Sequence, residues 1–477
     1  MIKDLDPTAL EQFIIDEYDK NILPSFKKFL SVPNVSPAYD KNWNKNGLLK
    51  EAAKVLNEYA VNLGIPGLNV TFYGGEEENV TPLLYIDIDG TSKDGKRVLL
   101  YGHYDKQPPL TGWDEGKGPY TPVVEDDYLY ARGAADDGFA IYAALTSIKA
   151  LRKFKIPHPK IIILIEGCEE SGSLDLPFYI EKYKSFIGSP DLILAMDSGC
   201  LDYNRLWLCN SLRGTISFNL SVTTLTKGIH SGKASGVAPE TLMILRSLIS
   251  RIEDYKTGNV TMKEFEVEIP EEVKNSAKKT LDAVGDVWLK NIPFLPGVKS
   301  ICDDLLTTYL NSTWNPSLAI LGVKGLPDLN NAGNVLRPTT TFRVGIRLPP
   351  TFDSSKAKAL LESILTKDPP FDCEIKLSDF IYDDGAYVTN ISENLKSELS
   401  KISQTYFKND YLEVSIGVSI PFVKIFMNMF PSAQIIVTGC AGNDSRCHSQ
   451  NERLNIPYFK KFMCALTNLI GDYNKFI

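Results

Sequence analysis

Three short apolar runs restrict the fold of this chain more than any other feature. The runs are Val98–Tyr101, Ile161–Ile165 and Leu192–Met196, and no polar residue interrupts them. Such runs are typical of strands buried on both faces of a largely parallel sheet. Apolar residues at helical spacing over 139–154 indicate a helix that covers the sheet. The sequence therefore predicts an α/β fold.

The pattern of apolar and polar residues changes near Leu212, and the earlier α/β pattern returns after Ala386. Between these points apolar and polar residues alternate, and the predicted elements follow the order β-α-β-β-α-β of a ferredoxin-like layer, with a helical insertion at roughly 255–316. We therefore expect a discontinuous catalytic α/β domain and an inserted α+β domain. The predicted boundaries are 1–211 and 386–477 for the first and 212–385 for the second.

Bulk composition narrows the class of protein. The 477 residues carry a formal net charge of −8, which argues against nucleic acid or an anionic membrane as a partner. The eight cysteines are scattered and form no CxxC pair, which favours free thiols in a reducing compartment. The sequence begins without a signal-peptide pattern and contains no run of ~20 apolar residues. We expect a cytoplasmic protein.

Imidazole and carboxylate side chains follow each predicted strand. His103 and Asp105 follow the first run, Glu169 and Glu170 the second, and Asp197 the third. Because sites in open α/β sheets form at the carboxyl ends of the strands, these side chains are predicted to meet in one crevice.

Two further residues complete the candidate set. Asp136 precedes the predicted helix, and His448, one of only four histidines, follows a predicted strand at 435–437. Alone, Asp136 or Asp137 is a plausible helix cap, and a His-x-Asp pair is usually a hydrogen-bonded pair at a strand end. Together, two imidazoles and three or four carboxylates suit two divalent cations, Zn²⁺ or Mn²⁺. His158, between two prolines, is predicted to lie in an exposed turn.

Several sequence strings also carry a family resemblance. In this order, they resemble the di-metal metallopeptidases that include carboxypeptidase G, aminoacylase and peptidase V, and most of all the branch of carnosinase and cytosolic non-specific dipeptidase. The resemblance runs from about Phe26 to the C-terminus. It implies a zinc-exopeptidase-like catalytic domain with an inserted lid and dimerisation domain. The strings are Gly102–Asp105, Gly133–Asp137, Glu166–Gly172, Ile229–Gly232 and His448–Glu452.

The resemblance also implies roles for the metal centre. His103 and Asp197 are expected to bind one ion, Glu170 and His448 the other, and Asp136 to bridge them. Asp105 is expected to orient the His103 ring. Glu169 resembles the general base that takes a proton from a metal-bridged water and returns it to the leaving amine.

Residues of the inserted domain and one nearby loop are expected to contact substrate. By resemblance, His230 reaches the site from the partner subunit's lid and stabilises the oxyanion, although a turn histidine is the plain alternative. Asn334, Arg347 and Ser419 align with substrate contacts, and an arginine suits the carboxylate of a dipeptide. Arg347 is otherwise an exposed strand residue.

The chain departs from that branch at two places. Gly138 stands where the branch usually has lysine, and residues 415–421 read Ser-Ile-Gly-Val-Ser-Ile-Pro in place of Arg-Glu-Gly-Gly-Ser-Ile-Pro. Cys447, beside His448, is either a soft extra ligand or a packed thiol. These departures bear on substrate choice.

The sequence thus predicts a homodimeric metallo-exopeptidase that cleaves dipeptides or short peptides, as Cys-Gly and non-specific dipeptidases do. The predicted cofactors are two divalent cations per subunit, with Zn²⁺ favoured over Mn²⁺. Two alternatives stay open: an N-acyl-amino-acid amidohydrolase of the same fold, and a catalytically silent binding relative.

Overall fold

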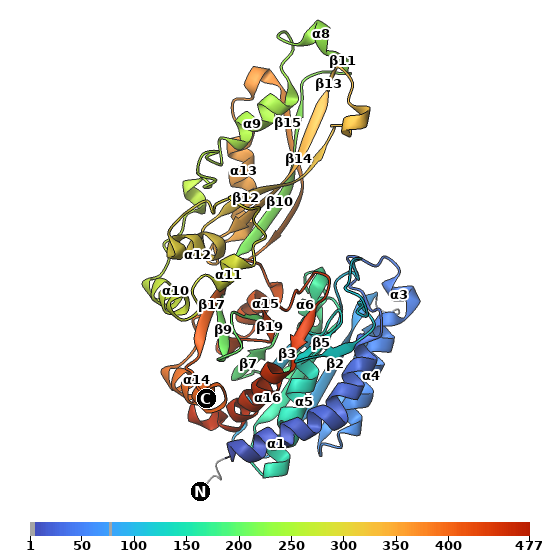
Figure 1. Cartoon of the computed structure of the whole chain (residues 1–477), viewed down its shortest axis with the longest axis vertical. Helices are drawn as coiled ribbons and strands as arrows, with labels where there is room; N and C mark the ends of the chain where they lie inside the picture. Colours follow the sequence, from blue (N-terminus) through green and yellow to red (C-terminus); the bar gives the residue numbers. More distant parts are fainter. Residues whose placement is uncertain (1–4, 76–78) are drawn as a thin grey trace.

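A six-stranded sheet forms the centre of the larger lobe in the computed structural model, which describes residues 5–75 and 79–477 (Figure 1). The three predicted apolar runs form β3, β6 and β7, which lie next to each other in parallel and are almost entirely buried. In sheet order the strands are β1 (Leu68–Gly75), β2 (Val80–Ile88), β6 (Lys160–Glu166), β3 (Arg97–His103), β7 (Leu192–Ala195) and β18 (Gln434–Val437).

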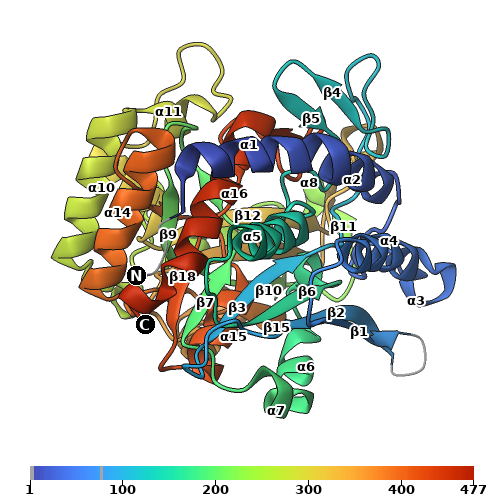
Figure 2. The same cartoon turned by 90° about the horizontal axis from the view of Figure 1, so that it is seen from below.

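Helices cover both faces of this sheet, which explains why its strands are apolar without alternation (Figure 2). On one face, the Phe139 ring before α5 meets Phe459 and Phe462 of α16. On the other face, Tyr101 of β3 packs on Phe422 of α15, with ring centroids 4.1 Å apart. The main helices are α1 (Pro7–Glu17), α2 (Leu23–Leu30), α4 (Leu48–Asn62), α5 (Ala140–Phe154), α14 (Glu393–Phe407), α15 (Pro421–Met429) and α16 (Ile456–Gly471).

The smaller lobe has its own sheet and its own core. Its four strands pair antiparallel in the order β12-β14-β10-β15, and buried side chains from α9 and α13 complete the core. The strands are β10 (Gly214–Thr223), β12 (Ser317–Lys324), β14 (Thr339–Leu348) and β15 (Glu374–Asp383), and the helices are α9 (Thr241–Ile249) and α13 (Ala357–Leu365). This arrangement confirms the ferredoxin-like layer.

The predicted helical insertion divides between two cores: Val260, Met262 and Phe265 pack in the core of the smaller lobe, but the two main helices of the insertion do not. Its helices α10 (Glu271–Val284) and α12 (Leu305–Thr313) share a separate core with Trp314 and Tyr387. They lie against a three-stranded sheet formed by β16 (Ala386–Tyr387), β9 (Trp207–Leu212) and β17 (Leu412–Ile416). The chain crosses between the lobes at β9 and β16, so the insertion lies at the junction (Figure 1).

The far end of the smaller lobe is a short two-stranded pairing of β11 (Ile229–His230) with β13 (Val335–Leu336), beside the short helix α8 (Ser231–Ala234) (Figure 1). Among the described residues, no helix has the length and apolar character needed to span a membrane.

Candidate metal centre

The carboxyl ends of the central strands place the predicted side chains at one edge of the sheet. His103 is the last residue of β3, and Asp197 lies two residues after β7. Glu169 and Glu170 lie in a 3-10 turn, Glu169–Ser171, that follows β6. His448 arrives from a loop that β19 (Ala441–Gly442) holds beside β8 (Gly199–Cys200), just beyond Asp197. The three parallel strands therefore bring together residues that are far apart in the sequence.

Asp136 lies between two imidazole rings. Its Oδ1 is 3.1 Å from His103 Nε2, and its Oδ2 is 2.9 Å from His448 Nε2. His448 Nε2 is also 3.3 Å from Glu170 Oε2. Each oxygen of Asp136 thus faces a different histidine, which is the arrangement that a carboxylate bridging two ions requires.

Two overlapping groups of side chains are close enough to hold an ion. One contains His103, Asp136 and Glu170, and the other contains His103, Glu169 and Asp197, with potential ligand atoms of each group within 4.8 Å of one another. His103 Nε2 lies 3.8 Å from Asp197 Oδ2. All five residues are largely buried, whereas the His448 side chain is 56% exposed and lies at the mouth of the cluster.

Asp105 organises the cluster from behind. Its Oδ1 is 3.4 Å from His103 Nδ1, and the same ring nitrogen lies 3.1 Å from the Asp105 carbonyl oxygen. The backbone N–H groups of Glu169 and Glu170 donate to the two Asp105 carboxylate oxygens, both at 3.1 Å. The fully buried Asp105 therefore fixes both the ring and the acidic turn.

The charge balance of the cluster favours cations. Burial raises the pKa of Asp197 to about 7; His103 opposes the rise and Asp136 adds to it. Burial also raises the pKa of Glu169 and of Glu170. Carboxylates held this close without compensation are costly, because an unpaired buried charge costs several kcal/mol or more.

The pKa of Asp136 shifts in the opposite direction from those of the neighbouring carboxylates. Burial alone would raise the pKa of Asp136, but hydrogen bonds and positive charge from His103 and His448 outweigh burial and lower it. Burial alone would lower the pKa of His448, but its contacts with Asp136 and Glu170 outweigh burial and raise that pKa to about 11. With two imidazoles and several carboxylate oxygens, the residues fit two divalent ions of the Zn²⁺ or Mn²⁺ type.

The paired aspartates do not cap the following helix, contrary to that alternative. Helix α5 begins at Ala140, its N-cap residue is Phe139, and no side chain caps it. The Asp137 carboxylate instead accepts a hydrogen bond from the His103 backbone N–H at 3.2 Å. Both aspartates therefore face the cluster and not the helix terminus.

Arg132 and Glu452 are a buried pair that the sequence did not single out. Arg132 Nη1 donates to Glu452 Oε2 at 2.7 Å, and both side chains are 1% exposed. Glu452 Oε1 accepts the backbone N–H groups of Gly133, Ala135 and Asp136 at 3.0, 3.1 and 3.3 Å. One carboxylate therefore holds the backbone of the loop that presents Asp136. Its only sequence signal was its place at the end of the His448–Glu452 string.

The departure at Gly138 has a steric reason. A Cβ there would lie 2.5 Å from both Gly133 O and the Phe29 ring, so a side chain has no room. A buried lysine is nevertheless close by, because Lys106 Nζ lies 4.5 Å from the centre of the Phe29 ring. Its ammonium donates to the carbonyls of Phe29, Leu30 and Val32. The segment after β3 thus places a buried amino group in this neighbourhood, and burial lowers the pKa of Lys106 to about 7.

The atypical 415–421 loop is also contacted by a positively charged side chain from another segment of the chain. Arg213, buried where the chain enters the smaller lobe, donates to Gly417 O at 3.1 Å. Burial and the nearby Arg347 lower the pKa of Arg213 to about 10. Ser419 is half-buried in the same loop, between β17 and α15. Arg213 and Arg347 therefore place two guanidinium groups at the base of the smaller lobe.

The structure does not bring the lid residues to the cluster within one chain. His230 on β11 is exposed at the far end of the smaller lobe, and its Nδ1 accepts the Gly232 N–H at 3.1 Å (Figure 1). Asn334 is exposed beside it, with its carbonyl accepting the Ser231 N–H at 2.8 Å. Arg347 lies at the opposite end of the lid sheet, paired with Thr215 near the junction.

The prediction for His158 is wrong. Its side chain is fully buried, and its Nδ1 lies 2.8 Å from Pro159 O. It precedes β6, at the amino end of the strands and away from the cluster.

Cys447 is half-buried.

Comparison with known proteins agrees with this geometry. Residues 99–472 match the peptidase family M20/M25/M40. The chain belongs to this family. Its relatives include the Cys-Gly metallodipeptidase DUG1 of Saccharomyces cerevisiae, 24% identical over 95% of this chain and 96% of that protein. Another is the cysteinylglycine-S-conjugate dipeptidase of Corynebacterium striatum, 23% identical over 80% of this chain and 82% of that protein.

Solved M20/M25/M40 structures share the whole architecture. Human carnosine dipeptidase 1 is 22% identical and superposes with a TM-score of 0.75, covering 98% of this chain and 99% of that one. The Dug1p dipeptidase of Saccharomyces cerevisiae has a TM-score of 0.77, with 22% identity and 98% of each chain covered. The family match and the sequence relatives confirm the predicted family branch and the assignment to the metallopeptidase hydrolases, and the solved structures confirm the fold.

Proposed function

We propose that this protein is a metallodipeptidase that hydrolyses the peptide bond of dipeptides such as Cys-Gly, using two divalent cations. The observation that carries the proposal is Asp136, whose two oxygens face His103 and His448 at 3.1 and 2.9 Å. The relatives named as Cys-Gly metallodipeptidase and carnosine dipeptidase support the substrate class.

The ions are assigned by proximity. We assign His103 and Asp197 to one ion and Glu170 and His448 to the other, with Asp136 shared. When bound, the cations would supply Lewis acidity and lower the pKa of a water molecule near neutrality. Zn²⁺ is the favoured metal and Mn²⁺ the alternative.

The protein's own residues would then handle the protons. We assign Glu169 as the general base that accepts the proton of the attacking water and passes it to the leaving amine. Its burial beside Asp197 raises its pKa above the usual range, which suits a group that must both take and release a proton. Asp105 holds the His103 ring in place.

Substrate contacts are assigned to the lid and one loop. We assign the oxyanion contact to His230 and other substrate contacts to Asn334 and Ser419. The guanidinium of Arg347 suits the free carboxylate of a dipeptide. Since His230 is distant from the cluster of its own chain, the proposal includes a homodimer, formed through the inserted domain, in which each lid serves the partner's site.

The domain limits and the location of the protein are part of the same proposal. We place the catalytic domain at 1–211 and 386–477 and the inserted domain at 212–385. The crossings between the lobes at β9–β10 and β15–β16 support these limits. The scattered free cysteines support a cytoplasmic location.

Metal content and turnover test the proposal together. Mass spectrometry should find two Zn²⁺ or Mn²⁺ per chain, and Cys-Gly and Ala-Ala should be cleaved faster than N-acetyl amino acids. Faster cleavage of the acetylated set would replace the dipeptidase assignment with an amidohydrolase. Full metal content without turnover of either set would indicate a binding relative.

A further inference from the structure

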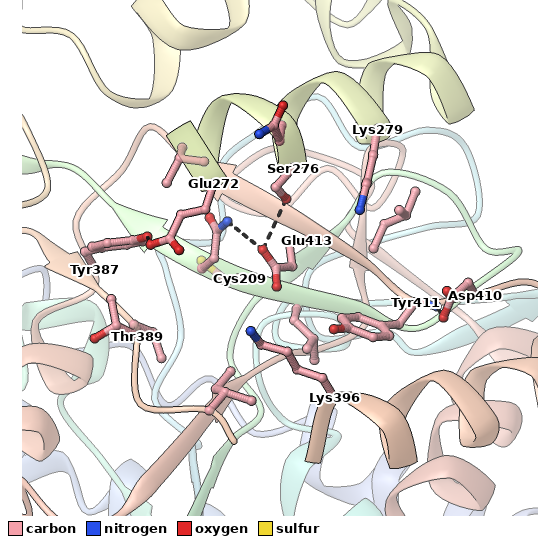
Figure 3. A pocket seen from close by; sticks show the side chains of 17 residues that line it. Cys209, Glu272, Ser276, Lys279, Tyr387, Thr389, Lys396, Asp410, Tyr411 and Glu413 are labelled. Atoms are coloured by element: carbon pink, nitrogen blue, oxygen red, sulfur yellow. Dashed lines mark hydrogen bonds between the residues drawn. The ribbon is translucent and has the colours of Figure 1, made fainter. Parts of the chain in front are cut away.

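A cavity of about 470 Å³ lies at the junction of the two lobes (Figure 3). Its walls come from α10, β9, β17, the start of α14 and the segment that follows β16. None of the residues that line it belongs to the metal centre. The cavity adjoins both strands at which the chain crosses between the lobes.

Three carboxylates line the cavity, those of Glu272, Asp410 and Glu413, and two side-chain hydrogen bonds fix Glu413 in place. Its Oε2 accepts hydrogen bonds from Asn210 Nδ2 at 3.0 Å and from Ser276 Oγ at 3.1 Å. Thr280 Oγ1 donates to the Glu413 backbone carbonyl at 2.7 Å and anchors α10 to β17. No hydrogen bond from the described residues reaches Oε1, which leaves that oxygen available to a donor in the cavity.

Two lysines supply positive charge from opposite walls. Lys279 on α10 and Lys396 on α14 extend toward the space beside Glu413 (Figure 3). Lys396 Nζ donates to Glu393 Oε1 at 2.8 Å at the rim. Within residues 5–75 and 79–477, Lys279 has neither a hydrogen bond nor an ion pair. The two ammonium groups can therefore share an anionic group of a ligand.

Apolar side chains form much of the remaining wall. This apolar wall can accept an aliphatic or aromatic side chain of a ligand, and burial of that side chain would add to the affinity. These residues are Leu208, Val273, Val388, Ile391 and Leu412.

We propose that this cavity binds a small zwitterion with an apolar side chain, either a free amino acid or a dipeptide. The ligand's ammonium group contacts Glu413, and its carboxylate lies between Lys279 and Lys396. A purely anionic ligand such as phosphate is disfavoured because Glu413 faces the same space. The ligand would contact α10, β9 and β17 together and so bind across the junction of the lobes. This site is separate from the metal centre and does not depend on the proposed function.

Equilibrium dialysis of radiolabelled L-leucine against the metal-loaded wild-type enzyme tests the site. We expect one binding site per chain that Glu413→Gln and Lys279→Met each weaken at least tenfold, while dipeptide turnover without added leucine is unchanged. The matched controls are Glu271→Gln and Lys274→Met, which alter exposed α10 residues that do not line the cavity. If leucine binding is the same in all five proteins, leucine binds elsewhere and the proposal is wrong.

Competition identifies the ligand chemistry. Isopentylamine lacks the carboxylate and 4-methylpentanoate lacks the amine, so each should compete at least tenfold less well than leucine. Equal competition by 4-methylpentanoate or by inorganic phosphate would indicate an anion site and overturn the zwitterion assignment. In the Glu169→Gln enzyme, where hydrolysis is expected to be blocked, competition by Leu-Leu separates a preference for dipeptides from one for free amino acids.

Discussion

The metal centre and the tip of the smaller lobe differ in how their side chains are held. In the metal centre, Asp105 fixes a ring and two backbone N–H groups, and Glu452 fixes three more. At the far end of the smaller lobe, His230 is exposed on a strand of two residues, and its ring accepts a hydrogen bond from the adjacent turn. The imidazole and carboxylate groups of the metal centre are therefore held from several sides at one edge of the sheet, whereas the proposed role of His230 requires that the lobes move or that a second copy supplies the residue.

The largest expected effect tests whether Glu169 is the general base of the metal centre. Glu169→Gln should keep both ions but lower kcat by about 10²–10⁴-fold, because the amide cannot accept the proton. Steady-state kinetics with metal analysis would measure this. Glu181→Gln, at an exposed helix position, is the control. Turnover within tenfold of wild type would mean that the base lies elsewhere.

The next effect tests whether His230, at the far end of the smaller lobe, acts as an oxyanion donor. His230→Ala should lower kcat by about 10²–10³-fold, the loss typical of one oxyanion donor, without changing metal content. The neighbouring exposed Lys233→Ala should have little effect.

Mixing the two inactive variants sharpens this comparison. If His230 acts on the partner's site, hybrids of His230→Ala and Glu169→Gln chains contain one intact site and regain part of the activity. Absence of recovery, once subunit exchange is demonstrated by differently tagged chains, would place His230 in its own chain's site after lid closure.

A smaller effect tests whether Glu452 holds the loop that presents Asp136 to the metal centre. Glu452→Gln removes the charge that pairs with buried Arg132 and loosens the loop that presents Asp136. We expect about 10–100-fold weaker metal binding, as for other residues that orient ligands, measured by competition with a chelator. Glu125→Gln alters an exposed carboxylate that pairs with Lys117, and it is the control. Unchanged metal affinity would mean that the loop holds its shape without this carboxylate.

Some of these features were predictable from the sequence, for physical reasons that differ by residue. Burial on both faces leaves a continuous apolar run, so β3, β6 and β7 and the polar residues after them could be located. The packing partners of the helices could not be predicted, because an apolar helix face such as that of α10 does not specify which sheet it covers. Glu452 was also overlooked, since its contacts join residues more than 300 positions apart.

His158 was misread for a similar reason, and it provides the smallest predicted effect. Its Pro-His-Pro setting is typical of a turn, but long-range packing buries it, and burial lowers its pKa from 6.5 to about 4. Between these pH values the unfolded chain binds a proton that the folded chain does not, so stability falls as pH falls through this window. The loss is at most about 3 kcal/mol. His158→Asn should therefore flatten the decline of Tm between pH 7 and 4.5 while leaving dipeptide turnover at pH 7.5 unchanged. An equal decline in both proteins would show that groups other than His158 account for the acid sensitivity.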